Sequence, residues 1–147
     1  MNNSTHILAG LTAAVALNAT APETALIALG ALLPDIDHSS STIGQNVKPV
    51  AWLLPHRGIT HSLLFASLAL LIHPSLAIGV GTHIILDLFN PAGVEFFWPF
   101  RKRLSVPLLS IKIDGLMEML LRLRFVFLLC WLLYPMVKNS FMFQRLF

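Results

Sequence analysis

Four short polar segments interrupt a chain that is otherwise mostly aliphatic. The most distinctive of them reads His56-Arg57-Gly58-Ile59-Thr60-His61-Ser62, and the others are Ser4-Thr5-His6, Pro34-Asp35-Ile36-Asp37-His38 and His83-Ile84-Ile85-Leu86-Asp87. Neutral imidazole nitrogens and carboxylate oxygens are the ligand set for zinc and its neighbours among the divalent metals. The pattern therefore predicts a scaffold of apolar helices that gathers one polar, metal-binding site.

The composition indicates a single domain, residues 1–147, embedded in a membrane. Hydrophobic residues make up 56% and charged residues 12% of the chain, whereas charged residues average about 25% in soluble domains. No apolar run reaches the 18 or so residues of an isolated spanning helix, so we expect tilted or partly embedded helices. Two alternatives remain. One is a soluble all-helical domain with an oversized core, and the other is a cleaved secretory signal peptide at 7–19, although that cleavage would remove His6.

The pattern of breaks predicts an all-α fold, a membrane-embedded bundle of about five helices. Proline, glycine and asparagine clusters separate the helices that we expect at 6–18, 23–33, 59–72, 75–89 and 116–137, with a short helix at 50–54. Short turns make antiparallel hairpins of the first two helices and of the third and fourth. All four polar segments and the two long loops, 35–55 and 95–114, then fall at one end of the bundle.

Two pairs of residues in these segments have spacings that suit metal ligation. His83 and Asp87 are four apart on an expected helix, so they share one face, and in an apolar helix such polar groups need a partner or a metal. Asp35 and Asp37 should point the same way in an extended segment, where a cation would relieve their repulsion. A simple His–Asp hydrogen bond and an ordinary acidic loop are the alternatives.

The central segment supplies further candidates. His56 and His61 would diverge on one regular helix, but Gly58 suggests that His56 lies in the loop and His61 in the helix. Arg57, always charged and forked, could hold a phosphate or carboxylate of a substrate, or else form a salt bridge to Asp35 or Asp37. The predicted metal ligands are His6, Asp35, Asp37, His56, His61, His83 and Asp87, and the predicted catalytic residues are Asp37 and Arg57.

The distribution of positive charge predicts the orientation of the site. Most Lys and Arg residues lie in or near the loops at the site-bearing end, namely Lys48, Arg57, Arg101, Lys102, Arg103 and Lys112. Short loops rich in Lys and Arg stay on the cytoplasmic side of a membrane. We therefore expect a multi-pass membrane protein with its site facing the cytoplasm.

The order of these motifs, with Trp98-Pro99 after them, resembles the YdjM-like family of bacterial inner-membrane proteins over residues 4–110. The resemblance implies a metal-dependent hydrolase. It also implies a distant similarity to zinc-dependent phospholipase C and P1 nuclease, from which His6, Asp35, His56, His61, His83 and Asp87 carry over as ligands, with Asp37 as a further ligand or base. Those enzymes are longer and largely soluble, and the ligand count here suits one or two metal ions.

These observations together predict a membrane-bound, metal-dependent hydrolase of a phosphoester or related bond. We expect a divalent metal ion, with Zn²⁺ as the preferred candidate. The expected partners are the lipid bilayer and a lipid-like or phosphorylated small-molecule substrate, and no nucleic acid is expected. Asp37 or Asp35 would take the proton of a metal-bound water, and Arg57 would neutralise substrate oxygens. The alternative is a non-catalytic, metal-stabilised membrane protein or a metal-ion carrier, and the oligomeric state is left open.

Overall fold

The computed structural model describes residues 1–106, 111–112 and 114–144, with side chains up to residue 138. Within these residues the fold is all-α, as predicted, and the single β-type contact is an isolated bridge between Val94 and Leu104. Along the chain come α1 (Asn3–Ala16), α2 (Ala21–Leu32), η1 (Leu33–Asp37), η2 (Gly44–Asn46), α3 (Lys48–Leu53), η3 (Ile59–His61), α4 (Leu63–Ile72), α5 (Pro74–Leu88) and α6 (Leu116–Gln144).

Over the described residues, no helix has both the length and the apolar character that crossing a membrane requires.

Local signals explain where the first helices begin. Asn2 caps α1 by accepting a hydrogen bond from the Ser4 amide, so the helix begins at Asn3, earlier than the expected start at residue 6. Thr20 and Glu23 form a capping box at the start of α2, with Pro22 in the first turn.

Two predictions about the segments around the site were wrong. The segment from Leu33 to Asp37 is a 3₁₀ turn rather than the expected extended segment, because proline is compatible with the first turn of a helix. The expected helix at 59–72 is divided at Ser62, whose backbone is extended and whose hydroxyl caps α4. His61 therefore lies in η3, just before α4 begins.

The closest helix contact joins α2 and α5, and it depends on two glycines. A Cβ on Gly30 would lie 2.2 Å from the Leu76 carbonyl oxygen, and a Cβ on Gly79 would lie 2.1 Å from that of Ile27. No side chain fits at these distances, so the two backbones touch. This contact places the C-terminal end of α2 and the following turn η1 beside the C-terminal half of α5.

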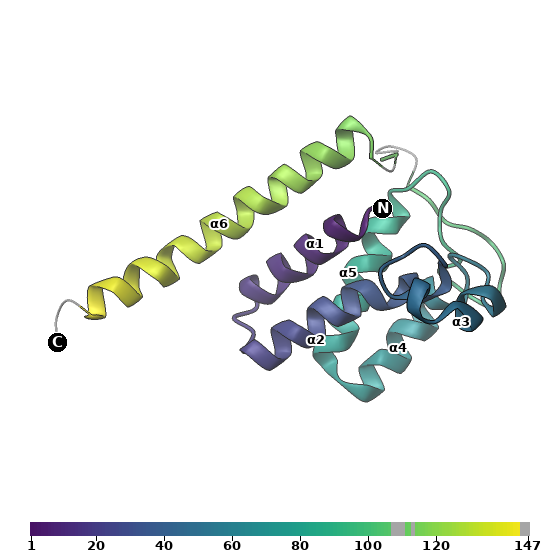
Figure 1. Cartoon of the computed structure of the whole chain (residues 1–147), viewed down its shortest axis with the longest axis horizontal. Helices are drawn as coiled ribbons and strands as arrows, with labels where there is room; N and C mark the ends of the chain where they lie inside the picture. The colour runs from purple at the N-terminus through teal and green to yellow at the C-terminus, as the bar shows by residue number, and fades with distance from the viewer. Residues whose placement is uncertain (107–110, 113, 145–147) are drawn as a thin grey trace.

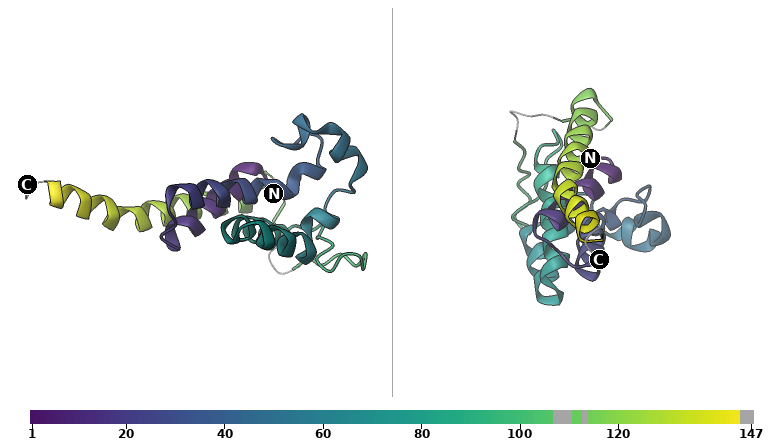
Figure 2. Two further views of the ribbon diagram at one scale, coloured as in Figure 1. Left: turned by 90° about the horizontal axis from the view of Figure 1, so that it is seen from below. Right: turned by 90° about the vertical axis from the view of Figure 1, so that its left-hand side faces the viewer.

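The helices form a compact bundle from which α6 extends. The helices α1, α2, α4 and α5 pack together, while α6 lies along α1 and continues past the bundle, so that its C-terminal part projects alone (Figures 1 and 2). α6 also continues through Pro135 to Gln144, beyond the expected end at 137. The N terminus and the loops gather at the opposite end (Figure 1).

Candidate metal centre

The structure brings side chains from all four polar segments to one end of the bundle. His6 comes from the first turn of α1, Asp35 from η1, His61 from η3, and His83 and Asp87 from the C-terminal half of α5. All five are buried. The predicted convergence of residues far apart in the sequence is therefore present in the fold.

Two histidine rings and two carboxylates form the centre of this cluster. The Nε2 atoms of His61 and His83 are 3.2 Å apart. Asp35 Oδ1 lies 3.7 Å from the first and 3.6 Å from the second, and Asp87 Oδ2 lies 3.6 Å from His61 Nε2. Ligands of a tetrahedral ion with bonds of about 2.0–2.2 Å would be about 3.3–3.6 Å apart. The spacing of Asp35, His61 and His83 thus suits one ion between them, whereas Asp87 forms a second possible ligand group with His6 and His83.

The far nitrogens of both rings point to hydrogen-bond acceptors, which fixes the tautomers. His83 Nδ1 is 2.7 Å from the Ala31 carbonyl oxygen and must donate to it. His61 Nδ1 lies 3.3 Å from Asp37 Oδ2, so it also carries the proton. Burial, followed by the charges that His6 and His61 can carry, holds the pKa of His83 below its ordinary value and keeps this ring neutral.

Both Nε2 atoms therefore present lone pairs to each other and to the nearby carboxylates. Such an arrangement is repulsive unless a cation or a shared proton lies at its centre. Metal-binding histidines in proteins have the same geometry, with one ring nitrogen held by a carbonyl or carboxylate and the other turned to the metal.

His6 adds a further ligand atom to this cluster. Its ring stacks on that of His83 with centroids 3.6 Å apart, and its Nε2 lies 3.5 Å from Asp87 Oδ1. Among the described residues neither of its ring nitrogens has a hydrogen-bond partner, although the side chain is fully buried. A buried polar group without a partner is costly, and a metal ion on the His6–His83–Asp87 group would give one of these two nitrogens a partner.

Asp37 occupies a position next to the centre and orients the histidines. Its Oδ1 lies 2.7 Å from His56 Nδ1, and its Oδ2 accepts hydrogen bonds from the Arg57 amide at 3.0 Å and from the Thr60 hydroxyl. Burial raises the pKa of this carboxyl, but the hydrogen bonds from His56, His61 and Thr60 outweigh it and hold the pKa well below its usual range. Asp37 is therefore ionised.

Asp37 also forms a possible ligand group with Asp35 and His56. Asp37 thus remains a predicted metal ligand. Its hydrogen bonds, however, favour a role in which it holds the His61 ring in position.

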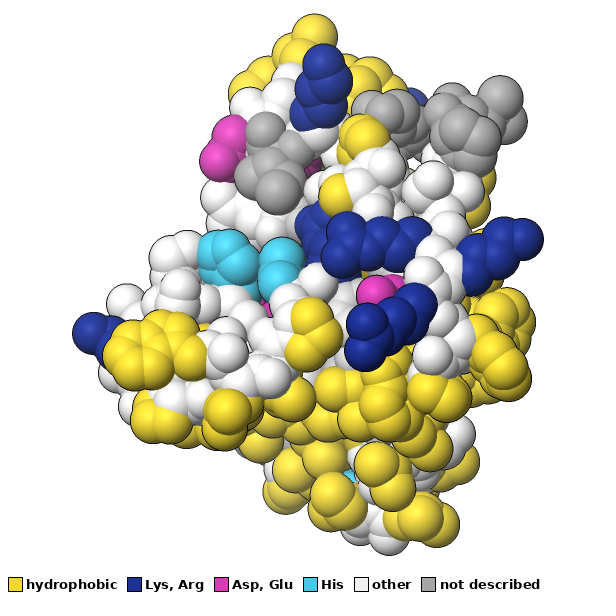
Figure 3. Space-filling view, turned by 90° about the vertical axis from the view of Figure 1, so that its right-hand side faces the viewer, with side chains coloured by type: hydrophobic (Ala, Val, Ile, Leu, Met, Phe, Trp, Pro, Cys, Tyr) yellow, Lys and Arg dark blue, Asp and Glu magenta, His cyan; other side chains and the backbone are white. Residues whose placement is uncertain are grey.

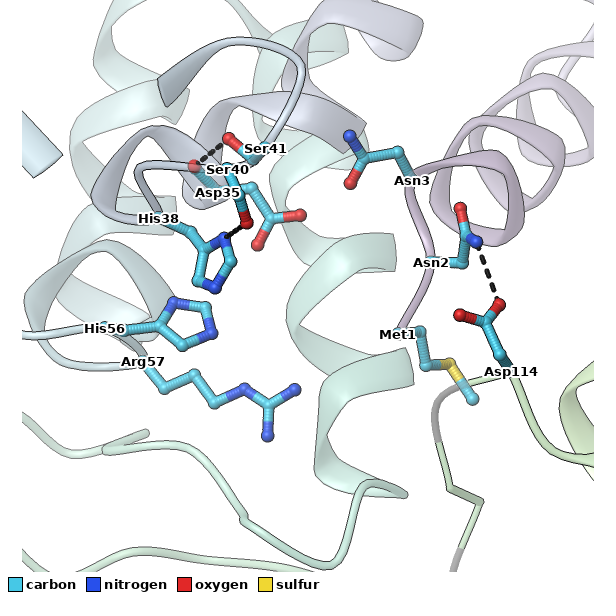
Figure 4. A pocket seen from close by; sticks show the side chains of 10 residues that line it. All are labelled: Met1, Asn2, Asn3, Asp35, His38, Ser40, Ser41, His56, Arg57 and Asp114. Carbon is cyan, nitrogen blue, oxygen red and sulfur yellow. Dashed lines mark hydrogen bonds between the residues drawn. The ribbon is translucent and has the colours of Figure 1, made fainter. Parts of the chain in front are cut away.

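Arg57 lies between the cluster and an open pocket. Its backbone has φ +65, which residues other than glycine rarely adopt. Its Nε is 3.2 Å from Asp87 Oδ2, so the alternative of a salt bridge to Asp35 or Asp37 was wrong. The end of its guanidinium points into the pocket (Figure 4).

This pocket has a volume of about 350 Å³. It lies beside the predicted metal ligands and opens to the surface. Its walls come from the N terminus, from the loop after η1 and from the segment that precedes η3 (Figure 4). It is lined by Met1, Asn2, Asn3, Asp35, His38, Ser40, Ser41, His56, Arg57 and Asp114.

Sequence reasoning missed two groups at the cluster. The amino group of Met1 lies 2.7 Å from Asp87 Oδ1, and the Ala31 carbonyl orients His83. Both are backbone groups, so no side-chain pattern could have revealed them. Glu118, the acidic residue in the first turn of α6, is buried against α1 and accepts hydrogen bonds from the amides of Asn2 and Asp114 and from the hydroxyl of Thr5.

With the geometry described, comparison with known proteins gives the family. Residues 1–143 match the family model described as YdjM inner membrane protein. The chain belongs to the YdjM family. The resemblance noted in the sequence is therefore confirmed, and it extends over nearly the whole chain.

Two YdjM relatives show how far the similarity reaches. The inner membrane protein YdjM of Escherichia coli (strain K12) is 34% identical over 131 residues, covering 76% of this chain and 67% of the relative. The uncharacterized protein YvsG of Bacillus subtilis (strain 168) is 35% identical over 127 residues, covering 74% of this chain and 79% of the relative. No solved structure matches this chain.

Proposed function

We propose that this YdjM-family chain is a membrane-associated, metal-dependent hydrolase of a phosphoester or related bond. The observation that carries the proposal is the approach of the His61 and His83 Nε2 atoms to 3.2 Å, with both lone pairs directed inward. Two carboxylates border them, and a polar pocket with an arginine lies beside them. The more specific comparison with phospholipase C and P1 nuclease rests on the motif resemblance alone.

In this proposal Asp35, His61 and His83 would hold one divalent ion. His6 and Asp87, which form a second possible group with His83, and His56, which forms a third with Asp35 and Asp37, would take part if a second ion binds. Zn²⁺ fits the nitrogen and oxygen donors, and a zinc ion bound there would lower the pKa of a water ligand and polarise the scissile group. Arg57, whose guanidinium end faces the pocket, binds the anionic oxygens of the substrate. Asp35 borders both cluster and pocket and receives the proton, while Asp37 holds His61 in position.

The surface of the molecule supports a membrane partner. Large apolar side chains are exposed on several helices, among them Trp52 at 76%, Leu71 at 84% and Phe127 at 71%. Exposed apolar area on this scale marks membrane or protein contact. We propose the bacterial inner membrane as the location, with the site on the cytoplasmic side, and a lipid-like or phosphorylated small molecule as the substrate. That the chain crosses the membrane several times stays a prediction.

A non-catalytic role for the metal is the alternative. Deep burial of His6, His61 and His83 is compatible with an ion that only stabilises the fold, as in structural zinc sites. The open pocket beside Arg57 favours the hydrolase, because a purely structural ion needs no access for a substrate.

The test combines metal analysis with hydrolysis. The purified protein should contain about one or two equivalents of zinc by mass spectrometry and should cleave bis(p-nitrophenyl) phosphate or p-nitrophenyl phosphate. His61→Ala should lose both properties, and Arg57→Asn, which tolerates positive φ, should keep the metal but lower kcat/KM by about 10²-fold. His73→Asn, at the opposite end of the bundle, is the matched control.

The metal analysis tests the metal centre, and the hydrolysis assay tests the catalytic role. Metal-free protein under zinc-replete conditions would contradict the metal centre. Metal without hydrolysis of either probe or of a phospholipid would favour the structural alternative.

A further inference from the structure

A second opening, separate from the polar pocket, lies between α4 and the loop that precedes α6. It has a volume of about 670 Å³ and is lined by Leu63, Leu64, Ser67, Phe96, Phe97, Trp98, Phe100 and Lys102. We call it the apolar groove. Leu63, Leu64, Phe97 and Phe100 are between 41% and 75% exposed, so the groove presents hydrocarbon to its surroundings.

The wall of the apolar groove is held in place by backbone hydrogen bonds. The Leu63 amide donates to the Phe96 carbonyl at 2.8 Å, and the Glu95 amide donates to the Arg57 carbonyl at 3.0 Å. Val94 and Leu104 exchange two further backbone bonds of 2.9 Å. The groove is therefore a formed feature, and its wall is tied to the segment that carries Arg57 and His61.

Positive charge borders the groove on one side. Lys102 is part of the lining, and Arg101 and Arg103 beside it are exposed. None of these three cations takes part in an ion pair of the described residues, although the half-buried Glu95 lies on the same loop. In Figure 3 Lys and Arg side chains border the apolar area at this end of the molecule.

The lining offers an extended peptide few side-chain hydrogen-bonding groups, namely those of Ser67, Trp98 and Lys102. Its one side-chain hydroxyl, that of Ser67, already donates to the Leu63 carbonyl at 2.9 Å. An extended peptide placed there would leave most of its backbone amides and carbonyls without partners, which is costly. A hydrocarbon chain has no such groups, and its burial is favourable in proportion to the apolar area removed from water.

We propose that the apolar groove binds an acyl chain of an anionic phospholipid of the bilayer, and that Lys102, with Arg101 and Arg103, meets its phosphate. The aromatic side chains Phe97, Trp98 and Phe100 then lie at the depth of the lipid head groups, where aromatic residues are enriched. Cations close to an anionic leaflet are attracted to it. This inference rests on the proposed membrane association and is independent of the hydrolase activity.

The experiment uses the tryptophan in the groove wall as a reporter. In the full chain with Trp52→Phe and Trp131→Phe, Trp98 is the remaining tryptophan. The protein is placed in nanodiscs in which a fixed fraction of lipid carries bromine on its acyl chains, as phosphatidylglycerol in one sample and phosphatidylcholine in the other. Brominated chains quench tryptophan only in contact, so we expect at least twofold stronger quenching by the anionic lipid.

Charge reversal separates the groove from general membrane contact. Lys102→Glu should make quenching by the two lipids equal, whereas Lys48→Glu, an exposed lysine on α3, should preserve the difference. Equal quenching by both lipids in the parent protein, or equal effects of the two charge reversals, would overturn the proposal. Failure to enter nanodiscs would instead contradict the membrane association itself.

Discussion

At the scale of single residues, the arrangement of His61 and His83 defines the candidate site. Each ring has its Nδ1 committed to an acceptor, and the two Nε2 atoms meet at 3.2 Å. The two facing Nε2 lone pairs, with the Asp35 carboxylate beside them, repel one another unless a cation or a shared proton lies between them. The stability of the fold should therefore depend on the ion.

Removing the metal should destabilise the protein measurably. An ion that binds only the native state stabilises it by about 2.7 kcal/mol at a hundredfold excess over its Kd, so a chelator should lower the midpoint of thermal unfolding. Zinc should restore that midpoint. His83→Ala should unfold at the same temperature with and without chelator, since it lacks a ligand. A chelator effect of the same size in that variant would show that the ion binds elsewhere.

At the scale of elements, the contact between α2 and α5 determines whether the site can form. Gly30 and Gly79 allow the two backbones to touch, and the Ala31 carbonyl that orients His83 comes from α2 beside this contact. Any added volume there would separate the helices that carry the two halves of the cluster.

Two glycines on α5 offer a matched test of this packing. Gly79→Ala should destabilise the protein by about 1–3 kcal/mol or more, because its Cβ meets backbone atoms that cannot move aside. Gly81→Ala, on the same helix with nothing within 4 Å of an added Cβ, should be neutral or slightly stabilising. Chemical unfolding of both variants measures the difference, and equal effects would contradict the close contact.

Glu118 joins α6 to the first turn of α1. It is fully buried and accepts hydrogen bonds from Asn2 N, Thr5 Oγ1 and Asp114 N at 2.6–2.8 Å. Burial raises the pKa of this carboxyl, but these hydrogen bonds outweigh burial and lower it from its ordinary value of 4.5. Glu118 thus contributes as an ionised group to the position of α1, which carries His6.

The direction of the pKa shift predicts how this contribution depends on pH. Because the pKa is lower in the folded than in the unfolded state, the stabilisation is present above about pH 5 and is lost as the pH falls. Glu118→Gln should destabilise the protein by about 1–3 kcal/mol at pH 7, and the difference from the parent should shrink on acidification. Asp114→Asn, exposed and at positive φ, is the control and should change stability little.

At the scale of the whole molecule, most charged side chains lie at one end of the bundle. The N terminus lies at the site end (Figure 1), where it lines the pocket together with the loops (Figure 4), and Lys and Arg side chains gather on that face of the molecule (Figure 3). Exposed leucine and isoleucine side chains lie at the end of α4, with Leu71 at 84% and Ile72 at 76%. Trp52 and Phe100, at 76% and 75% exposed, lie at the site end as well, so that end combines basic and apolar surface, as at a membrane–water interface.

The side of the membrane on which the site lies can be measured with a single cysteine. Cys130 is exposed on α6 and must be replaced by serine before Ser40, exposed at the rim of the pocket, is changed to cysteine. In intact cells this thiol should resist an impermeant maleimide and should react after the cells are opened. Labelling in intact cells would place the site outside the cytoplasm.

The sequence by itself determined the helices, their order and the end of the bundle at which the polar residues gather. Hydrophobic runs mark the helices, and prolines and glycines mark their ends. Because short turns connect them, neighbouring helices must run antiparallel. His6, Asp35, His61, His83 and Asp87 could therefore be placed together from connectivity alone.

Only the tertiary structure decided which atoms face one another. The Ala31 carbonyl lies 52 positions from His83 in the chain, Arg57 pairs with Asp87 rather than with Asp35 or Asp37, and Glu118 turns to α1 instead of the site. These contacts depend on how closely α2 approaches α5 and how α6 lies on α1. Backbone acceptors and packing distances leave no signature in the order of side chains, so they arise only when the helices pack.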